Sequence, residues 1–226
     1  MKRIKIAKII TLIAVGSFSA IAVLGAKSTK SNNTSQSKNN SLNALEDSTL
    51  IKTNDNPIAI IKVKDVGVME FELYPSIAPN TVNNFIYLAN SGFYNNLHFY
   101  KLIKNFCIQG GSPDNTPSGG PDYKIKGEFN SNNISNNLSH NIGTISMARF
   151  TDNDSAGSQF FITTTDCTNL DGNYAAFGRI TKGIDILMSL NNYETNQLTY
   201  EPLTDIIIES VSVDTKGLTY LRPEKI

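Results

Sequence analysis

The sequence of 226 residues has no tryptophan, only two cysteines and only two histidines, and these scarcities narrow the chemistry that is open to it. Cys107 and Cys167 lie far apart, without the spacing that metal sites share, and two histidines cannot complete a zinc site by themselves. We therefore expect no metal and no other cofactor, and we expect both thiols to be free.

An excess of charge of one sign is also lacking, since 20 Lys and Arg balance 20 Asp and Glu. The charges are unevenly placed, however: residues 1–56 hold eight basic and three acidic side chains, which leaves twelve and seventeen for residues 57–226. The second part is mildly acidic, which argues against a nucleic-acid-binding surface. A hydrophobic content of 40% with 18% charged residues is typical of a soluble globular domain with extensions.

Long apolar runs are confined to the N-terminus. Residues 9–26 are uncharged and follow Lys2, Arg3, Lys5 and Lys8, which is the pattern of an export signal. Ala-Ile-Ala at 20–22 offers a cleavage site, but the run is also long enough to remain as a membrane anchor. Either outcome places the rest of the chain outside the cytoplasm, with the membrane contacted only through residues 9–26 if they are not cleaved.

The remaining chain divides into three parts. Residues 27–56 are rich in Ser, Asn, Thr and Lys, which predicts a disordered tether because little apolar surface can offset the cost of ordering. Residues 57–214 have the patterns of a folded domain without internal repeats, and residues 215–226 form a C-terminal tail.

Within the domain, alternating and β-branched runs predict short strands at residues 58–63, 68–73, 98–103, 106–109, 144–147, 159–163, 175–180 and 205–213. Helical spacing predicts a helix at 80–91, and a second helix at 183–190 that buries Ile184, Leu187 and Met188. The loop-like residues 112–141 are expected to be irregular but packed. Eight short strands with two short helices predict a mainly β fold, a closed antiparallel barrel capped by the helices.

The stretch from His98 to Gly111 carries the first candidate site. Alternation predicts Phe99, Lys101 and Ile103 on one face, with His98, Tyr100 and Leu102 on the other. A second run at 106–109 follows the polar pair at 104–105, which should bring together Lys101, Phe106 and Gln109. A cation, an aromatic ring and an amide suit a small apolar ligand with a carbonyl group, although a plain hairpin in a β-rich core remains the alternative.

Three further motifs combine small, aromatic and amide residues: Met-Ala-Arg at 147–149, Gln-Phe-Phe at 159–161 and Leu-Asp-Gly-Asn-Tyr at 170–174. The adjacent Phe160 and Phe161 take opposite faces of a strand, so one ring faces the core and the other faces outwards. With Phe-Cys-Ile-Gln-Gly-Gly at 106–111 and Asn-Asn-Phe at 83–85, these motifs resemble the cyclophilin family of peptidyl-prolyl cis/trans isomerases. Gly-Gly-Ser-Pro-Asp at 110–114 is similar to its bacterial branch.

The resemblance covers residues 57–213 and implies the family's eight-stranded barrel. It implies an isomerase that assists the folding of exported proteins and works without a covalent intermediate. Its partners would be proline-containing peptides and unfolded or exported proteins, with no nucleic acid, and a monomer is expected.

The resemblance also implies a role for each matching position. Phe160 would belong to the core, whereas a proline pocket would be formed by Phe106, Cys107, Phe161, Leu170 and Tyr174. The implied catalytic residues are Lys101, Phe106 and Gln109. The implied substrate-binding residues are Cys107, Ala148, Arg149, Gln159, Phe161, Leu170 and Tyr174.

The sequence departs from the family pattern at two of these positions and at the neighbouring Asn169. Lys101 stands where the family carries its central catalytic arginine, and an ammonium lacks the planar fork of a guanidinium. We therefore expect isomerase activity to survive at a lowered rate. Cys107 replaces the usual methionine, and Asn169 stands where eukaryotic members carry the tryptophan that binds cyclosporin, so strong binding of that drug is not expected.

Two functions remain open on the sequence alone. The first is the exported prolyl isomerase. The second is a proline-peptide-binding module or chaperone with weak or no isomerase activity, which the lysine at position 101 favours.

Overall fold

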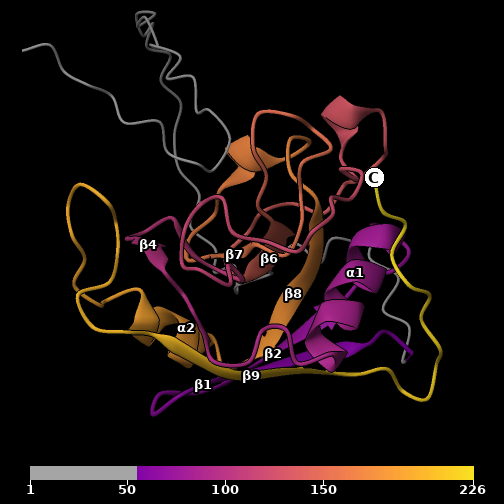
Figure 1. The fold of residues 1–226 in the computed structure, drawn as a ribbon. Helices are drawn as coiled ribbons and strands as arrows, with labels where there is room; N and C mark the ends of the chain where they lie inside the picture. Colours follow the sequence, from indigo (N-terminus) through magenta and orange to yellow (C-terminus); the bar gives the residue numbers. More distant parts are fainter. Residues whose placement is uncertain (1–54) are drawn as a thin grey trace, which may run out of the picture.

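The computed structural model describes residues 55–226, and within them nine strands form one curled antiparallel sheet with two helices against it (Figure 1). The helices are α1 (Pro79–Asn90) and α2 (Ile184–Leu190), and two short 3-10 turns are η1 (Asn130–Asn132) and η2 (Thr168–Leu170). The strands are β1 (Ile58–Val63), β2 (Gly67–Leu73), β3 (Leu97–His98), β4 (Lys101–Ile103), β5 (Cys107–Gly110), β6 (Thr144–Met147), β7 (Phe160–Thr163), β8 (Ala176–Lys182) and β9 (Ile207–Asp214).

The order of the strands across the sheet is β3-β9-β1-β2-β8-β6-β7-β5-β4. Its two end strands, β3 and β4, are consecutive in the chain, and no ladder of hydrogen bonds pairs them within residues 55–226. The short segment Phe99–Tyr100 carries the chain from one end of the sheet to the other. The leader and the tether predicted from the sequence lie outside the described residues.

The predicted count of eight strands is wrong by one, because the run at 98–103 divides into two strands with different partners. β3 pairs with β9, whereas β4 pairs with β5. At the division, the Phe99 ring packs edge-on against Phe160 inside the core, with ring centroids 6.0 Å apart. The predicted alternation, which placed Phe99 and Lys101 on one face, is therefore wrong at this point. Phe99 faces the main core, whereas Tyr100 does not.

Helix α1 packs against β9, and α2 packs against β2. The first turn of α1 is capped by a carboxylate from a distant loop, because Glu128 accepts hydrogen bonds from the backbone N–H groups of Asn80 (3.0 Å) and Thr81 (2.7 Å). In α2, Leu187 and Leu190 are buried, whereas Ile184 is 42% exposed. The predicted burial of Ile184 is therefore wrong, since this residue is the first of the helix and its side chain is exposed, and Met188 is only half-buried.

The main core lies between the curled sheet and the two helices. One face of each central strand contributes to it, as with Ile108 of β5, Phe160 and Ile162 of β7, and Ile145 and Met147 of β6. The loop at residues 112–141 is irregular yet packed, with buried side chains at Ile125, Phe129 and Leu138. The opposite face of β4, β5, β6 and β7 is then free to carry a site.

Candidate active site on the outer face of β4 to β7

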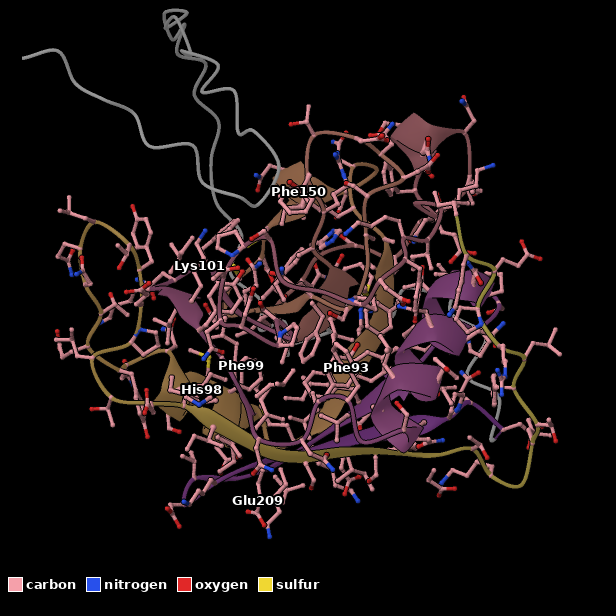
Figure 2. The ribbon with its side chains drawn as sticks, viewed as in Figure 1. Phe93, His98, Phe99, Lys101, Phe150 and Glu209 are labelled. Atoms are coloured by element: carbon pink, nitrogen blue, oxygen red, sulfur yellow. The ribbon has the colours of Figure 1, made fainter. Side chains whose placement is uncertain are left out.

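A row of side chains crosses this outer face because the register aligns one residue of each strand. Lys101 of β4 is opposite Gln109 of β5, and Gln109 is opposite Phe161 of β7. Directly paired residues project to the same side of a sheet. The cation, the amide and the aromatic ring predicted from the motifs therefore stand side by side (Figure 2 shows Lys101 on the side of the molecule away from β9 and Glu209).

Lys101 is unusually buried for a lysine, with only 8% of its surface exposed. Its ammonium group forms no hydrogen bond or ion pair with any residue between 55 and 226. Burial lowers the pKa of Lys101 from its ordinary value, while the nearby Cys107 thiol acts in the opposite direction. The site thus holds a partly desolvated cation that no side chain of the described residues neutralises.

An apolar cluster lies next to this row, and we name it the outer cluster. It is separate from the main core and consists of Cys107, Ala148, Phe161, Cys167, Leu170 and Tyr174, with Phe106 packed against it. The Phe161 and Tyr174 rings meet edge-to-face, with centroids 5.7 Å apart. All five residues predicted for a proline pocket fall in this cluster, and Phe160 lies in the main core as predicted.

Three polar side chains form a buried triangle at the edge of the row. Tyr100 donates a hydrogen bond to Gln159 Oε1 (2.6 Å), and Gln109 Nε2 donates to both Tyr100 (2.8 Å) and Gln159 Oε1 (2.9 Å). Gln159 Nε2 in turn donates to the carbonyl oxygens of Pro117 (2.8 Å) and Gly119 (2.7 Å). Gln109 Oε1 is buried and has no hydrogen-bond partner among residues 55–226, which leaves one acceptor of the site unused there.

Arg149 is already engaged by the protein. Its guanidinium lies between two rings, 5.0 Å from the centroid of Phe129 and 4.9 Å from that of Tyr174. It also donates hydrogen bonds to the carbonyl oxygens of Asn173 (3.0 Å) and Phe150 (2.9 Å). Arg149 is therefore placed to stiffen the Tyr174 side of the outer cluster.

A shallow groove adjoins the outer cluster at Ala148, and we name it the Ala148 groove. The predicted residues Ala148, Arg149 and Gln159 line it together with Lys124, Phe150 and Gly157. Because Ala148 belongs both to the groove and to the outer cluster, the two surfaces are continuous. Figure 2 shows Phe150 on the same side of the molecule as Lys101.

Three residues of the site were not predicted from the sequence: Tyr100, Cys167 and His140. His140 is fully buried behind the outer cluster, where its ring stacks on Phe161 with an interplanar angle of 10°. Its Nδ1 lies 2.8 Å from Asp171 Oδ1, and its Nε2 lies 3.0 Å from Ser146 Oγ. The position of Asp171 within the Leu-Asp-Gly-Asn-Tyr motif is the one sequence signal for this arrangement, since its partners are distant in the chain.

Both cysteines are free thiols. Burial raises the pKa of Cys107, and it raises the pKa of Cys167 to about 11. Both groups are therefore neutral at physiological pH and act as small apolar side chains. No group of three or more His, Cys, Asp or Glu side chains among residues 55–226 is arranged to hold a metal ion.

The family model described as "Cyclophilin type peptidyl-prolyl cis-trans isomerase/CLD" matches residues 58–213, which include the whole sheet except the last residue of β9. The chain belongs to this family. It is a cyclophilin-type peptidyl-prolyl cis-trans isomerase.

Curated relatives of this isomerase come from bacteria and animals. Peptidyl-prolyl cis-trans isomerase B of Bacillus subtilis is 42% identical over 130 residues, covering 58% of this chain and 87% of the relative. A peptidyl-prolyl cis-trans isomerase of Helicobacter pylori is 41% identical over 139 residues, covering 61% and 76%. The human peptidyl-prolyl cis-trans isomerase-like 3 is 37% identical over 150 residues, covering 66% and 91%.

A solved cyclophilin-type isomerase of Cryptosporidium parvum superposes on this one with a TM-score of 0.64 and 33% sequence identity, covering 70% of this chain and 98% of the other. That structure was determined in the presence of the dipeptide Ala-Pro. In the present isomerase, no helix within residues 55–226 has the length and apolar character needed to cross a membrane.

Proposed function

We propose that this isomerase catalyses rotation about X–Pro bonds of exported or unfolded proteins by non-covalent stabilisation of the twisted amide, with Lys101, Phe106 and Gln109 as its catalytic residues. The observation that supports this most directly is the row Lys101–Gln109–Phe161 beside the outer cluster. Each part of the row matches one requirement of the reaction.

The reaction must break the resonance of an amide, against a barrier of about 18–20 kcal/mol. Resonance gives way when the amide twists, and the prolyl nitrogen then becomes pyramidal with an available lone pair. Catalysis needs a site that binds this twisted state more tightly than either planar isomer. No proton transfer and no covalent bond to the enzyme is required.

The outer cluster supplies a surface for the proline ring, made by Phe106, Phe161, Leu170 and Tyr174 with Cys107 at its floor. Tyr100 and Gln159 hold the Gln109 amide rigidly beside the outer cluster. Lys101 then offers its ammonium to the prolyl nitrogen. A desolvated cation interacts strongly with a lone pair that exists only in the twisted state.

Lysine at this position limits the rate. An ammonium on a flexible stem has no planar fork, so it cannot be held by Gln109 and contact the substrate at the same time. Only Gln109 Oε1 could accept a hydrogen bond from the ammonium, and among residues 55–226 this atom has no partner. We therefore expect catalysis at a rate below that of an arginine-bearing site.

The test is the Lys101→Arg variant, assayed for isomerisation of a proline tetrapeptide in a protease-coupled reaction. We expect kcat/KM to rise at least about tenfold, which corresponds to about 1.4 kcal/mol of extra transition-state stabilisation. Lys104→Arg is the matched control, because Lys104 lies in the exposed turn between β4 and β5 and should leave the rate unchanged. An unchanged rate in Lys101→Arg would mean that Lys101 is not the limiting donor.

A proline-peptide-binding module with little catalysis is the second candidate, favoured by the unbraced ammonium of Lys101. The two candidates differ in one measurement. If exchange between cis and trans peptide, followed by NMR, is not accelerated by a concentration of protein that saturates the peptide, the binding module is the correct function.

We also propose that the enzyme acts outside the cytoplasm, secreted or tethered to the outer face of the membrane by residues 9–26. The support is the basic and apolar N-terminal pattern of the sequence. External protease added to intact cells should remove an epitope placed at the C-terminus. Protection of the epitope until the cells are lysed would contradict this location.

A further inference from the structure

The last five residues of the chain are tied to the body of the domain at two points. Asn80 of α1 exchanges two hydrogen bonds with the backbone of Glu224, at 2.7 and 3.0 Å. Ile226, the final residue, exchanges two backbone hydrogen bonds with Lys124, at 2.9 and 3.3 Å. Figure 1 shows this C-terminal segment running beside α1 to the end of the chain.

Side chains reinforce the second point. The Lys225 ammonium lies 4.0 Å from the centroid of the Tyr123 ring, which is a close cation–π contact. Tyr123 donates a hydrogen bond to Asn84 Oδ1 (2.8 Å), and Asn84 Nδ2 donates to the carbonyl oxygen of Gly157 (2.7 Å). Gly157 is itself part of the Ala148 groove.

Residues 123–125 are therefore held from both sides. On one side is the C-terminal segment, and on the other an antiparallel bridge joins Ile125 to Ala156. Lys124 lies in the middle of this short extended segment, and its side chain lines the Ala148 groove. The chain terminus thus fixes the backbone of a residue that contributes to the groove.

The charged side chains that line the Ala148 groove are both basic. Lys124 and Arg149 both line it, and no acidic residue is found among the described residues of its wall. Arg149 is occupied by two rings and by carbonyl oxygens, whereas the Lys124 ammonium has, in the described part of the chain, only a loose contact with the Phe150 ring, 5.7 Å from its centroid. Lys124 is accordingly the cation that can turn to a ligand.

We propose that the Ala148 groove selects an acidic side chain of the proline-containing client, with Lys124 as the specificity-determining residue and with the C-terminal segment, residues 222–226, holding Lys124 in position. This inference rests on the proposed isomerase function, because the groove is continuous with the outer cluster through Ala148. A client whose proline occupies the outer cluster can reach the groove with a side chain a short distance along its backbone.

The test measures isomerisation by NMR exchange with peptides that differ only in charge. Glu, Gln or Lys is placed two residues before the proline in one series and two residues after it in the other. In one of the series we expect kcat/KM for the Glu peptide to exceed that for the isosteric Gln peptide about threefold to fivefold, the range of a solvent-exposed ion pair. The Lys peptide should be the poorest substrate of that series.

Lys124→Glu should reverse this order, and Lys124→Gln should abolish it. Lys126→Glu makes the same change of charge on the exposed residue two positions further along, which does not line the groove, and should leave the order intact. If the wild-type enzyme isomerises Glu and Gln peptides equally in both series, the inference is overturned although the proposed function stands. If no peptide is isomerised, the proposed function fails first.

The role of the C-terminal segment is tested by a chain that ends at Glu224, which lacks the cation–π contact and both backbone bonds to Lys124. We expect its preference for Glu over Gln to fall towards equality while its circular dichroism spectrum stays that of the full chain. A truncated enzyme that keeps the full preference would contradict the positioning role. Lys225→Met supplies a second variant, because it removes the contact with Tyr123 without shortening the chain.

Discussion

Phe160 and Phe161 differ by one position and serve different parts of the molecule. The Phe160 ring meets Phe85, Tyr94 and Phe99 edge-on within the main core. The Phe161 ring lies on the other side of β7, between His140 and Tyr174 in the outer cluster. Both are fully buried, so burial alone does not separate a structural ring from a functional one.

Substitution by leucine should separate them. Phe160→Leu should lower the free energy of unfolding by roughly 1–2 kcal/mol through lost aromatic contacts, with little change in kcat/KM of the folded enzyme. Phe161→Leu should reduce kcat/KM about tenfold or more, because the proline ring loses its flat partner. Urea unfolding and the isomerase assay, run on both variants, check this, and equal losses of activity in the two would contradict it.

His140 gives the protein a dependence of stability on pH. Burial lowers the pKa of its imidazole, and this effect outweighs the opposite influence of Asp171. Below the ordinary histidine pKa of about 6.5, the His140 imidazole is protonated in the unfolded chain, whereas in the folded chain it stays neutral to a lower pH. Stability due to the neutral ring is therefore present above that pH and is lost as the pH falls.

We expect the midpoint of thermal unfolding to decline between about pH 7 and pH 5, and His140→Gln to flatten this part of the curve while lowering stability overall. His98→Gln is the control, because His98 is part-exposed at the surface, 3.7 Å from Asp205. A decline of the same steepness in His140→Gln would show that other groups cause it.

At the scale of single elements, the connection between β8 and α2 depends on a glycine with a left-handed backbone. Gly183 has φ +82°, and a Cβ at this position would meet the backbone of Val68 and Met69. Gly217 near the end of the chain has a similar φ of +79°, but open space surrounds it. The two glycines share the conformation and differ in the room around them.

Gly217→Ala should cost only the strain of a left-handed alanine, about 1–2 kcal/mol in the free energy of unfolding. Gly183→Ala adds a steric conflict with the β2 backbone and should cost clearly more. Chemical denaturation of the two variants measures the difference directly. Equal costs would mean that the backbone of β2 yields to the added methyl group.

Most helices and strands could be predicted from the sequence, because the pattern that indicates each of them lies within its own residues. The hairpin of β1 and β2, the strands β6 and β7 and helix α1 all follow from periodicity, and Gly92, with a left-handed φ of +75°, comes two residues after the end of α1. The division between β3 and β4 could not be predicted. It depends on Phe99 turning towards Phe160 and on strand partners that are distant in the sequence.

At the scale of the whole molecule, the sheet joins the two ends of the domain. The last strand, β9, lies between β1 and β3, so β1 cannot complete its pairing until residues 207–214 have been synthesised. Pairings between distant segments slow folding, because the entropy of closing long loops is lost before the contacts form.

We therefore expect the main phase of refolding to fall in roughly the millisecond-to-second range typical of sheets with distant pairings. Stopped-flow tyrosine fluorescence after dilution from urea measures it, since the chain has nine tyrosines and no tryptophan. A main phase that is complete within microseconds would contradict this expectation.

The membership of the site was largely predictable, whereas its geometry was not. Phe106, Cys107, Phe161, Leu170 and Tyr174 were predicted by resemblance and do lie together. Three features of the geometry could not be predicted: the triangle around Gln109, the contacts of the His140 ring, and the contact between residue 226 and Lys124. Each joins residues that are distant in the sequence, so no local pattern indicates it. Their catalytic and binding roles stay predictions until the variants are measured.

The exposed residue Asn169 sits on the turn η2 directly before Leu170, one of the buried members of the outer cluster. Because the natural chain contains no tryptophan, Asn169→Trp would give the molecule a single indole next to the surface proposed for proline. Its emission could be excited apart from all nine tyrosines. The absence of tryptophan thus allows a single introduced indole to act as a reporter. Its emission wavelength and intensity would change when a client binds and when it dissociates.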